Sequence, residues 1–320
     1  MPPEPDTRNH TMKRTLVMVL CLGSLWLAGQ SVVRADTDTL RVGVSLADLG
    51  NPFFYALAQH LQDAANDQSS QPVEMTVVSS AYDLQRQQAQ IRRFIDDRVD
   101  IILLSAADSV GIEPVIHQAR QAGITVTAVD IDAQGADLSV TTDNVQAGMV
   151  ACRYLAERMG GAGDLGIING ASVSSVTDRV AGCRAALQEY PGIRLVSDRF
   201  NAGGTFGGGL EAMTFLLSQH PSINGVFAIN DPSALGAAEA ATMAGREDVL
   251  ITSVDGSDQV LAALAANHPN LIGTAAQSPE EMARRAIEVS LAHRANRLQS
   301  PRSIRIPTHL ITRESLPVEP

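Results

Sequence analysis

Short apolar runs alternate with longer amphipathic stretches along most of this chain, and this alternation restricts its fold more than any other feature. In the first half the runs are 40–46, 73–78, 101–104 and 125–129, and in the second half they are 165–168, 193–196, 225–229 and 249–254. Such a βαβ rhythm predicts parallel strands connected by helices. Because the runs show little alternation of apolar and polar residues, we expect helices on both faces of each sheet.

The first 35 residues have the features of a cleaved export signal. A basic tripeptide at 12–14 precedes an almost wholly apolar run at 15–28, and small residues at 33–35 fit the cleavage positions. Met12 is the better start, and the mature chain is expected to begin near Asp36. The apolar run is too short for a confident membrane span. We therefore expect a soluble protein in the periplasm, and residues 36–320 are long enough for two domains.

Several classes of function are disfavoured by composition and motif context. The net charge of −11 argues against a nucleic-acid surface. The glycine pattern at 161–166 has dinucleotide-fingerprint spacing but precedes a strand, whereas a phosphate loop follows one. The histidines are scattered without metal-ligand spacing, and the serines at 172–175 lack a nucleophile elbow. We expect neither a cofactor, nor a bound metal, nor an enzyme.

Polar side chains follow the ends of several predicted strands, where ligands bind in open parallel α/β sheets. Carboxylates accept hydrogen bonds from hydroxyl groups, while arginine and amides donate them, so the mixture suits a hydroxyl-rich ligand. Aspartates and asparagines after strands also serve as helix N-caps, and this interpretation fits Asp143 and Asp231 best. Arg179 has the alternative of a surface pair with Asp178. The candidate residues at these ends are Asn51, Asp130, Asp132, Arg179, Asn230, Asp255 and Gln277.

The tetrapeptide Asn51-Pro52-Phe53-Phe54 follows the first predicted strand. An amide beside two aromatic rings offers a hydrogen-bonding edge and an apolar face, which together match a sugar. The alternative is that Pro52 occupies the first position of a helix while Phe53 and Phe54 fill the core.

These residues also carry a family resemblance. The chain resembles periplasmic sugar-binding proteins of the ribose-binding type, the soluble receptors of ABC importers, from about Leu40 to Thr312. Seven motifs occur in order: Asn51-Pro52-Phe53-Phe54, Val129-Asp130, Thr142-Asp143-Asn144, Arg179-Val180-Ala181-Gly182, Phe227-Ala228-Ile229-Asn230-Asp231 with Ala234-Leu235-Gly236, Val254-Asp255-Gly256, and Ala276-Gln277.

The resemblance implies an α/β fold of the periplasmic-binding-protein type I, in which two doubly wound, Rossmann-like lobes are joined by a three-strand hinge. The first lobe would comprise 36–141 plus 278–306, and the second 142–277 plus 307–320. Ligand would bridge both lobes and favour a closed state, which a membrane permease reads. A periplasmic sensor that docks on a chemoreceptor or histidine kinase is the alternative. We expect a monomer.

Two departures from the family pattern concern the ligand. Ribose-type proteins usually have an arginine directly after the aspartate that matches Asp130, whereas this chain has Ile131 and then Asp132. An aromatic residue expected around 201–205 is also missing, although Phe206 follows closely. By resemblance the ligand contacts are otherwise in place: Asn51, Phe53, Phe54, Asp130, Arg179, Asn230, Asp255 and Gln277. The ligand is therefore expected to be a small polyhydroxylated molecule, a sugar alcohol or a monosaccharide, with a sugar alcohol favoured over ribose.

Two cysteines, Cys152 and Cys183, follow the predicted cleavage site. An even number of cysteines in an oxidising compartment favours a disulfide between them. Two small buried thiols are the alternative, and the choice depends on whether the two predicted helices share a sheet face.

Overall fold

The computed structural model describes residues 39–297 and 302–316, all within one compact unit, Thr37–Pro320. The predicted export signal lies outside the described residues. No helix in the described part of the chain is long and apolar enough to cross a membrane.

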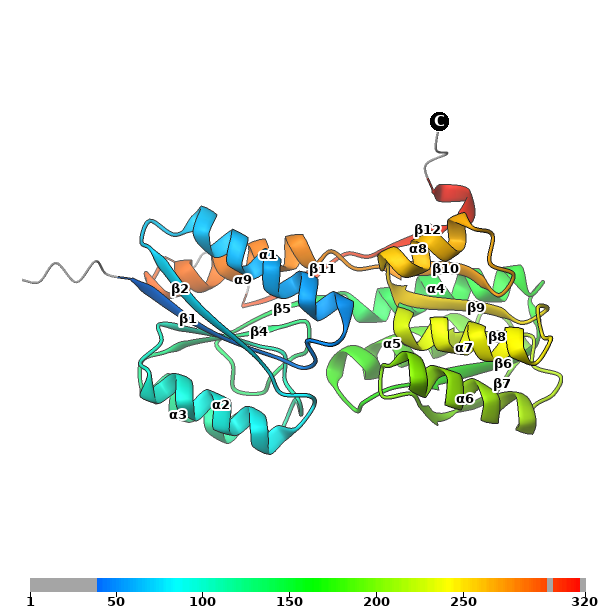
Figure 1. The fold of residues 1–320 in the computed structure, drawn as a ribbon, viewed down its shortest axis with the longest axis horizontal. Coiled ribbons are helices and arrows are strands. Elements are labelled where there is room, and N and C mark those ends of the chain that lie inside the picture. The colour runs from blue at the N-terminus through cyan, green and yellow to red at the C-terminus, as the bar shows by residue number, and fades with distance from the viewer. Residues whose placement is uncertain (1–38, 298–301, 317–320) are drawn as a thin grey trace, which may run out of the picture. The chain divides into compact units, whose positions relative to one another are not determined.

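Five strands from the first half of the chain and β11 from near its end build a six-stranded sheet in the order β11-β5-β4-β3-β1-β2, and every strand pair in it is parallel. Helices α1 and α9 cover one face and α2 and α3 cover the other (Figure 1). The strands are β1 (Leu40–Leu46), β2 (Val73–Ser79), β3 (Ile101–Leu104), β4 (Thr125–Val129), β5 (Leu138–Thr142) and β11 (Ser303–Ile306). The helices are α1 (Pro52–Gln68), α2 (Leu84–Asp96), α3 (Glu113–Gln121) and α9 (Pro279–Arg294).

The second sheet also has six strands, in the order β12-β10-β9-β8-β6-β7. Helices α4 and α5 pack together on one face, and α6 and α7 pack together on the other, beside α8. The strands are β6 (Ala162–Asn169), β7 (Gly192–Asn201), β8 (Gly225–Ala228), β9 (Leu250–Asp255), β10 (Leu271–Ala276) and β12 (His309–Thr312). The helices are α4 (Asn144–Arg158), α5 (Ser174–Leu187), α6 (Phe206–Gln219), α7 (Asp231–Met243), α8 (Asp258–Ala265) and a final 3-10 turn, η1 (Arg313–Ser315).

Two α/β lobes with parallel sheets confirm the predicted fold class. The structure adds one departure, because β12 pairs with β10 in the antiparallel direction at the edge of the second sheet. It also adds strand β5, which the apolar runs did not predict. The run at 193–196 is part of a longer strand, β7, whose exposed residues alternate with partly buried ones at the sheet edge.

The chain passes between the two sheets near the three predicted crossings. Strand β5 ends at Thr142 in the first sheet, and α4 then packs against strands of the second. Strand β10 is followed by α9, which packs against α1 and β4. Only Pro307 and Thr308 separate β11 of the first sheet from β12 of the second. The lobe boundaries at 141/142, 277/278 and 306/307 stay predictions that this topology supports.

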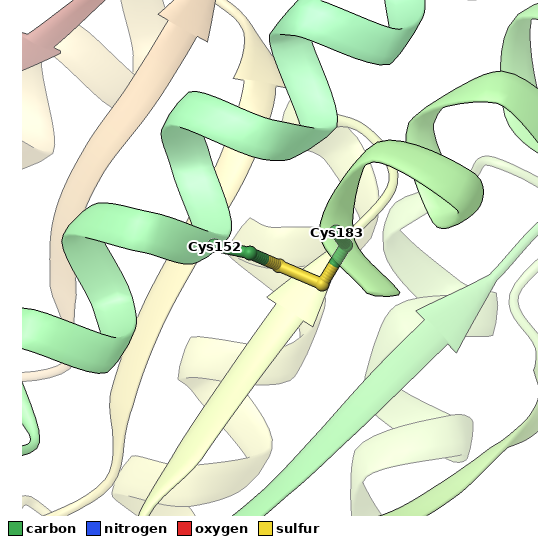
Figure 2. Close-up of a disulfide and its surroundings, with 2 residues drawn as sticks. All are labelled: Cys152 and Cys183. Atoms are coloured by element: carbon green, nitrogen blue, oxygen red, sulfur yellow. A yellow bond between two sulfur atoms is a disulfide. The ribbon is translucent and has the colours of Figure 1, made fainter. Parts of the chain in front are cut away.

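A disulfide joins α4 to α5 through Cys152 and Cys183, whose Cα atoms are 5.1 Å apart (Figure 2). Both cysteines are fully buried, so the prediction of a disulfide is confirmed. Glycines allow the two helices to approach closely. A Cβ on Gly148 would lie 1.9 Å from the carbonyl oxygen of Arg179, and one on Gly182 would lie 2.0 Å from that of Val145. This tight, cross-linked helix pair holds the N-terminal part of α5, which carries Arg179.

Candidate functional site

A small cavity of about 30 Å³ lies where the carboxyl ends of strands from both sheets meet. Because these ends collect the loops and helix N-termini of parallel α/β sheets, this is the expected place for a ligand. The first sheet and its helices contribute Asn51, Phe53, Phe54, Tyr82 and Asp130. The second contributes Ala171, Ser175, Val176, Arg179, Gly203, Gly204, Ile229, Asn230, Asp255 and Gln277. All of the predicted contacts except Asp132 are thus brought together.

Arg179 is buried at 5% exposure on α5 and is held in a fixed orientation. Its Nε donates a hydrogen bond to Oδ1 of Asn144 at 2.8 Å, and its Nη1 donates to the carbonyl oxygen of Ile229 at 2.8 Å. The same Nη1 lies 3.5 Å from Oδ1 of Asp255. The alternative of a surface pair with Asp178 does not occur, since Asp178 instead lies 3.7 Å from Arg305. The amide of Asn144 and the peptide carbonyl of Ile229 thus fix the orientation of the guanidinium plane beside the cavity.

Asp255 ends β9 and is held by two neighbours. Its Oδ1 accepts a hydrogen bond from Nε2 of Gln277 at 2.8 Å, and its Oδ2 accepts one from the backbone N–H of Asp231 at 3.4 Å. Gln277 is itself fixed, because its Oε1 accepts from Thr142 Oγ1 at 2.6 Å. Burial, opposed by Arg179 and reinforced by nearby Asp231, raises the pKa of Asp255 to about 7.

Asp130 follows β4 and is 3% exposed. Among the described residues, nothing donates a hydrogen bond to its buried Oδ1. Burial raises the pKa of Asp130 to about 6, although Arg179 lowers it. Both Asp130 and Asp255 have positive φ, 65° and 141°. Unfavourable backbone conformations and an unpaired buried carboxylate oxygen are concentrated at ligand sites, where a bound molecule completes the interactions.

Asn51 and Asn230 show that the cap and ligand interpretations both apply to the same residues. The Oδ1 of Asn51 caps α1 by accepting from the Phe53 N–H at 2.9 Å, and the Oδ1 of Asn230 caps α7 by accepting from the Ser233 N–H at 3.2 Å. Both amides nevertheless line the cavity. Since capping uses the carbonyl oxygen, the amide nitrogen is the part that faces other partners. The Nδ2 of Asn230 donates to the carbonyl oxygen of Gly204 at 2.9 Å.

Asp231 is not the cap that the sequence suggested, because Asn230 has that role. Asp231 is instead fully buried behind Asp255. Its carboxylate accepts from Ser253 Oγ at 2.5 Å, Thr274 Oγ1 at 2.7 Å and the Ser257 N–H at 2.6 Å. It therefore ties the ends of β9 and β10 to the start of α8. Asp143 is a cap as predicted, accepting from the Gln146 N–H at 3.0 Å.

The aromatic part of the cavity contains three rings. Phe53 and Phe54 are packed edge to face, with ring centroids 5.4 Å apart and planes 73° from parallel. Tyr82, which the sequence reasoning missed, also lines the cavity. It follows β2, so applying the strand-end rule to that strand would have identified it. Burial and the nearby Asp130 raise its pKa. Phe206 is not the missing ring, since it is 49% exposed and does not line this cavity.

Asp132 is the one predicted contact that the structure places elsewhere. Its carboxylate accepts a hydrogen bond from Ser139 on β5, and its backbone N–H donates to Ser174 Oγ at 2.8 Å. The preceding residue, Ile131, is buried at 1% exposure. The loop after β4 therefore directs only its first aspartate, Asp130, into the cavity.

Ser175 and the backbone of Gly203 and Gly204 were also missed by sequence reasoning. Ser175 lies in the first turn of α5, and both glycines have positive φ in the loop before α6. The sequence signal for the loop is the glycine pair itself, since glycine favours positive φ. The absence of a side chain there allows backbone groups to form part of the cavity wall.

The arrangement can hold a small hydroxylated molecule, because it combines carboxylate acceptors, a guanidinium and amide donors with an aromatic wall. No group of three or more potential metal ligands occurs in the described part of the chain.

Comparisons with known proteins agree with this geometry. The family model for the periplasmic binding protein domain matches residues 42–297. The ribose import binding protein RbsB of Bacillus subtilis is 29% identical over 78% of this chain and 80% of its own length. The xylitol-binding protein of Mycolicibacterium smegmatis is 29% identical over 79% of this chain and 72% of its own. A solved ABC transporter solute-binding protein from Mycobacterium smegmatis with bound glycerol has a TM-score of 0.80 at 27% identity, covering 87% of this chain and 95% of that one.

Proposed function

The chain belongs to the periplasmic binding protein domain family, and from this premise we propose that it is the soluble receptor of an ABC importer for a small polyol or monosaccharide. Members of the family are solute-binding receptors rather than enzymes, which agrees with the prediction from sequence. Of the two relatives described above, the one from Bacillus subtilis is named for ribose import and the one from Mycolicibacterium smegmatis for xylitol binding.

The observation that carries the proposal is a cavity with a fixed polar group on each side. Asp130 comes from the first sheet, while Arg179, Asn230 and Asp255 come from the second. A ligand that contacts both sets stabilises a closed arrangement more than an open one, and only such differential contact shifts a conformational equilibrium. The three chain crossings then act as the hinge.

A small polyol suits the cavity better than a larger sugar. Ile131 occupies the position after the aspartate where the ribose-type pattern has an arginine, and it is buried. This loop therefore brings no guanidinium to the cavity. We propose Asn51, Phe53, Phe54, Tyr82, Asp130, Arg179, Asn230 and Asp255 as ligand contacts, with Gln277 fixing Asp255.

The partner of the closed form is proposed to be the membrane permease of the importer, and the compartment is proposed to be the periplasm after signal cleavage. The alternative partner, a chemoreceptor or sensor kinase, uses the same closure. Reconstitution with the membrane permease and ATPase of the importer separates the two. A transport receptor stimulates ATP hydrolysis by the importer when ligand is present, whereas a protein that serves only a sensor does not.

The test combines a ligand screen with two substitutions in the cavity. Binding only to the folded state raises the melting temperature, so tetritols, pentitols, hexitols, pentoses and hexoses are screened by thermal shift. For the best ligand, calorimetry should show that Asn230→Ala and Asp255→Ala each weaken binding by about 1–3 kcal/mol, since each leaves a buried ligand group unpaired. Asp63→Ala and Asn66→Ala, on the exposed face of α1, are the matched controls.

Two results would contradict the proposal. Unchanged affinity in both cavity variants would show that the ligand binds elsewhere. A radius of gyration from X-ray scattering that does not fall when ligand is added would show that binding does not close the lobes.

A further inference from the structure

Three charged side chains line the cavity among the described residues: Asp130, Asp255 and Arg179. The guanidinium lies next to Asp255, with Nη1 and Oδ1 3.5 Å apart. Asp231, buried behind Asp255, adds a further acidic group on the same side. One cation is therefore shared by more than one carboxyl group, and among the described residues no second cation lines the cavity beside Asp130.

The surroundings of Asp130 supply no other compensation. Its buried Oδ1 accepts no hydrogen bond from the described residues. Neighbouring Ile131 is buried and apolar, and Asp132 adds negative charge nearby. Two of the three donor nitrogens of Arg179 are already bonded, Nε to Asn144 and Nη1 to Ile229. A buried charge without a partner is unfavourable, so the site favours a ligand that brings positive charge or donors to this oxygen.

Three aromatic rings line the same cavity as Asp130: Phe53, Phe54 and Tyr82. Aromatic faces attract ammonium groups, most strongly when water is excluded, and clusters of such rings recognise amine ligands. Asp130 and Tyr82 are close enough to interact electrostatically. A carboxylate beside several rings is the combination that suits an ammonium group, whereas rings alone equally suit the apolar face of a neutral sugar.

We propose that the preferred ligand is a small polyol carrying a cationic amine, whose ammonium group binds between Asp130 and the rings of Phe53, Phe54 and Tyr82. The hydroxyl groups of this ligand contact Arg179, Asn230 and Asp255 on the other side of the cavity. The inference rests on the proposed receptor function and specifies the ligand class. The ammonium group supplies a second positive charge for the two carboxyl groups that share Arg179, and it donates a hydrogen bond to Oδ1 of Asp130.

The experiment compares pairs of ligands that differ by one group. Calorimetry at pH 7.5 measures 2-amino-1,3-propanediol against glycerol, 1-amino-1-deoxysorbitol against sorbitol, and an amino-inositol against myo-inositol. In at least one pair the amine should bind about tenfold or more tightly than its hydroxyl counterpart, as expected for a desolvated cation–π contact combined with a charged hydrogen bond.

Asp130→Asn is the diagnostic variant. Asparagine tolerates the positive φ of 65° at this position and keeps the shape of the side chain. It should weaken binding of the amine more than binding of its hydroxyl counterpart, and so abolish the preference for the amine, because the neutral amide does not attract the ammonium charge. Tyr82→Leu keeps the carboxylate and should reduce the amine preference in part. Asp132→Asn, whose carboxylate faces Ser139, is the matched control and should keep the preference.

The outcomes separate this inference from the receptor function. Tighter binding of the neutral member in every pair that binds overturns the inference and leaves the receptor function in place. An amine preference that survives in Asp130→Asn also overturns it, because the charge then acts elsewhere. Should Asp130→Asn not fold, a reduced amine preference in Tyr82→Leu supports the inference and an unchanged preference overturns it. If no polyol, sugar or aminopolyol binds, the proposed function itself fails.

Discussion

Replacing Arg179 by methionine should destabilise the ligand-free protein strongly at pH 8 and much less at pH 5. The guanidinium is the cation that lines the cavity in the described part of the chain, and it lies beside Asp255. Methionine has a similar length and fills the space without charge. The substitution therefore leaves two buried carboxyl groups, Asp130 and Asp255, without their shared cation.

The expected magnitude follows from the kind of interaction that is lost. Removing one partner of a buried ion pair typically costs about 3–5 kcal/mol, because the remaining charge is uncompensated. The carbonyl oxygen of Ile229 and Oδ1 of Asn144 also lose a donor, and each unmade hydrogen bond adds about 1 kcal/mol. At pH 8, where both carboxyl groups are ionised in the wild-type protein, we expect a loss of roughly 5–7 kcal/mol in the free energy of unfolding.

The pH dependence follows from the direction of the pKa shifts. In the folded protein burial raises the pKa of Asp130 from 3.8 to about 6 and that of Asp255 to about 7. A raised pKa in the folded state gives stability that is fully present below the unfolded value and is lost as the pH rises through the folded value. For Asp130 this amounts to about 3 kcal/mol, at about 1.4 kcal/mol per pKa unit. The wild-type protein should thus lose stability between about pH 4 and pH 7.

Arg179 lowers both pKa values, so its removal raises them and extends this loss to higher pH. At pH 5 both carboxyl groups are largely neutral in the folded variant, and only the hydrogen bonds and packing are lost. Urea unfolding followed by circular dichroism at pH 5 and pH 8 measures the difference. Arg153→Met, which breaks the exposed pair with Glu189, is the control and should change little at either pH. Equal destabilisation of Arg179→Met at both values would refute the electrostatic reasoning.

Two further predictions concern the support of the cavity. Reducing the disulfide between Cys152 and Cys183, or replacing both cysteines by serine, should lower the free energy of unfolding by about 3–4 kcal/mol, the value that the chain-entropy model gives for a loop of this length. An unchanged midpoint of urea unfolding in dithiothreitol would contradict this expectation. Asp231→Asn should cost roughly 1–3 kcal/mol, because an amide cannot accept from all three donors. Asp143→Asn keeps its cap and is the control, so equal melting temperatures for the two variants would count against a special role for Asp231.

The sheets could be predicted from the sequence because their central strands are uninterrupted apolar runs. Strand β5 could not, since Ser139, Thr141 and Thr142 interrupt its apolar pattern. Its pairing comes from tertiary contact, between β4 on one side and the distant β11 on the other. The antiparallel direction of β12 likewise depends on the two-residue connection from β11, which no local pattern reveals.

The site was largely predictable because its residues follow strand ends, but the direction of individual side chains was not. The loop after β4 offers Asp130 and Asp132, and only the positive φ of Asp130 and the burial of Ile131 decide that the first faces the cavity. Tyr82 lies in a loop where it and Ala81 both adopt positive φ without any glycine. This conformation is rare for such residues, so sequence propensities do not indicate it.

The division of hydrogen-bonding roles explains what the ligand has to provide. Helix capping uses the carbonyl oxygens of Asn51 and Asn230, and Gln277 uses its amide on Asp255. Their carbonyl oxygens are thus already in use, and Oδ1 of Asp130 is a buried acceptor of the cavity that no described residue donates to. A molecule that only accepts hydrogen bonds, such as an ether or a ketone, would leave this carboxylate unpaired. Its binding would then be weakened by the free energy of removing water from the carboxylate, which no new hydrogen bond offsets. Donor groups clustered at one end of the ligand are thus the first requirement for binding, ahead of ring shape.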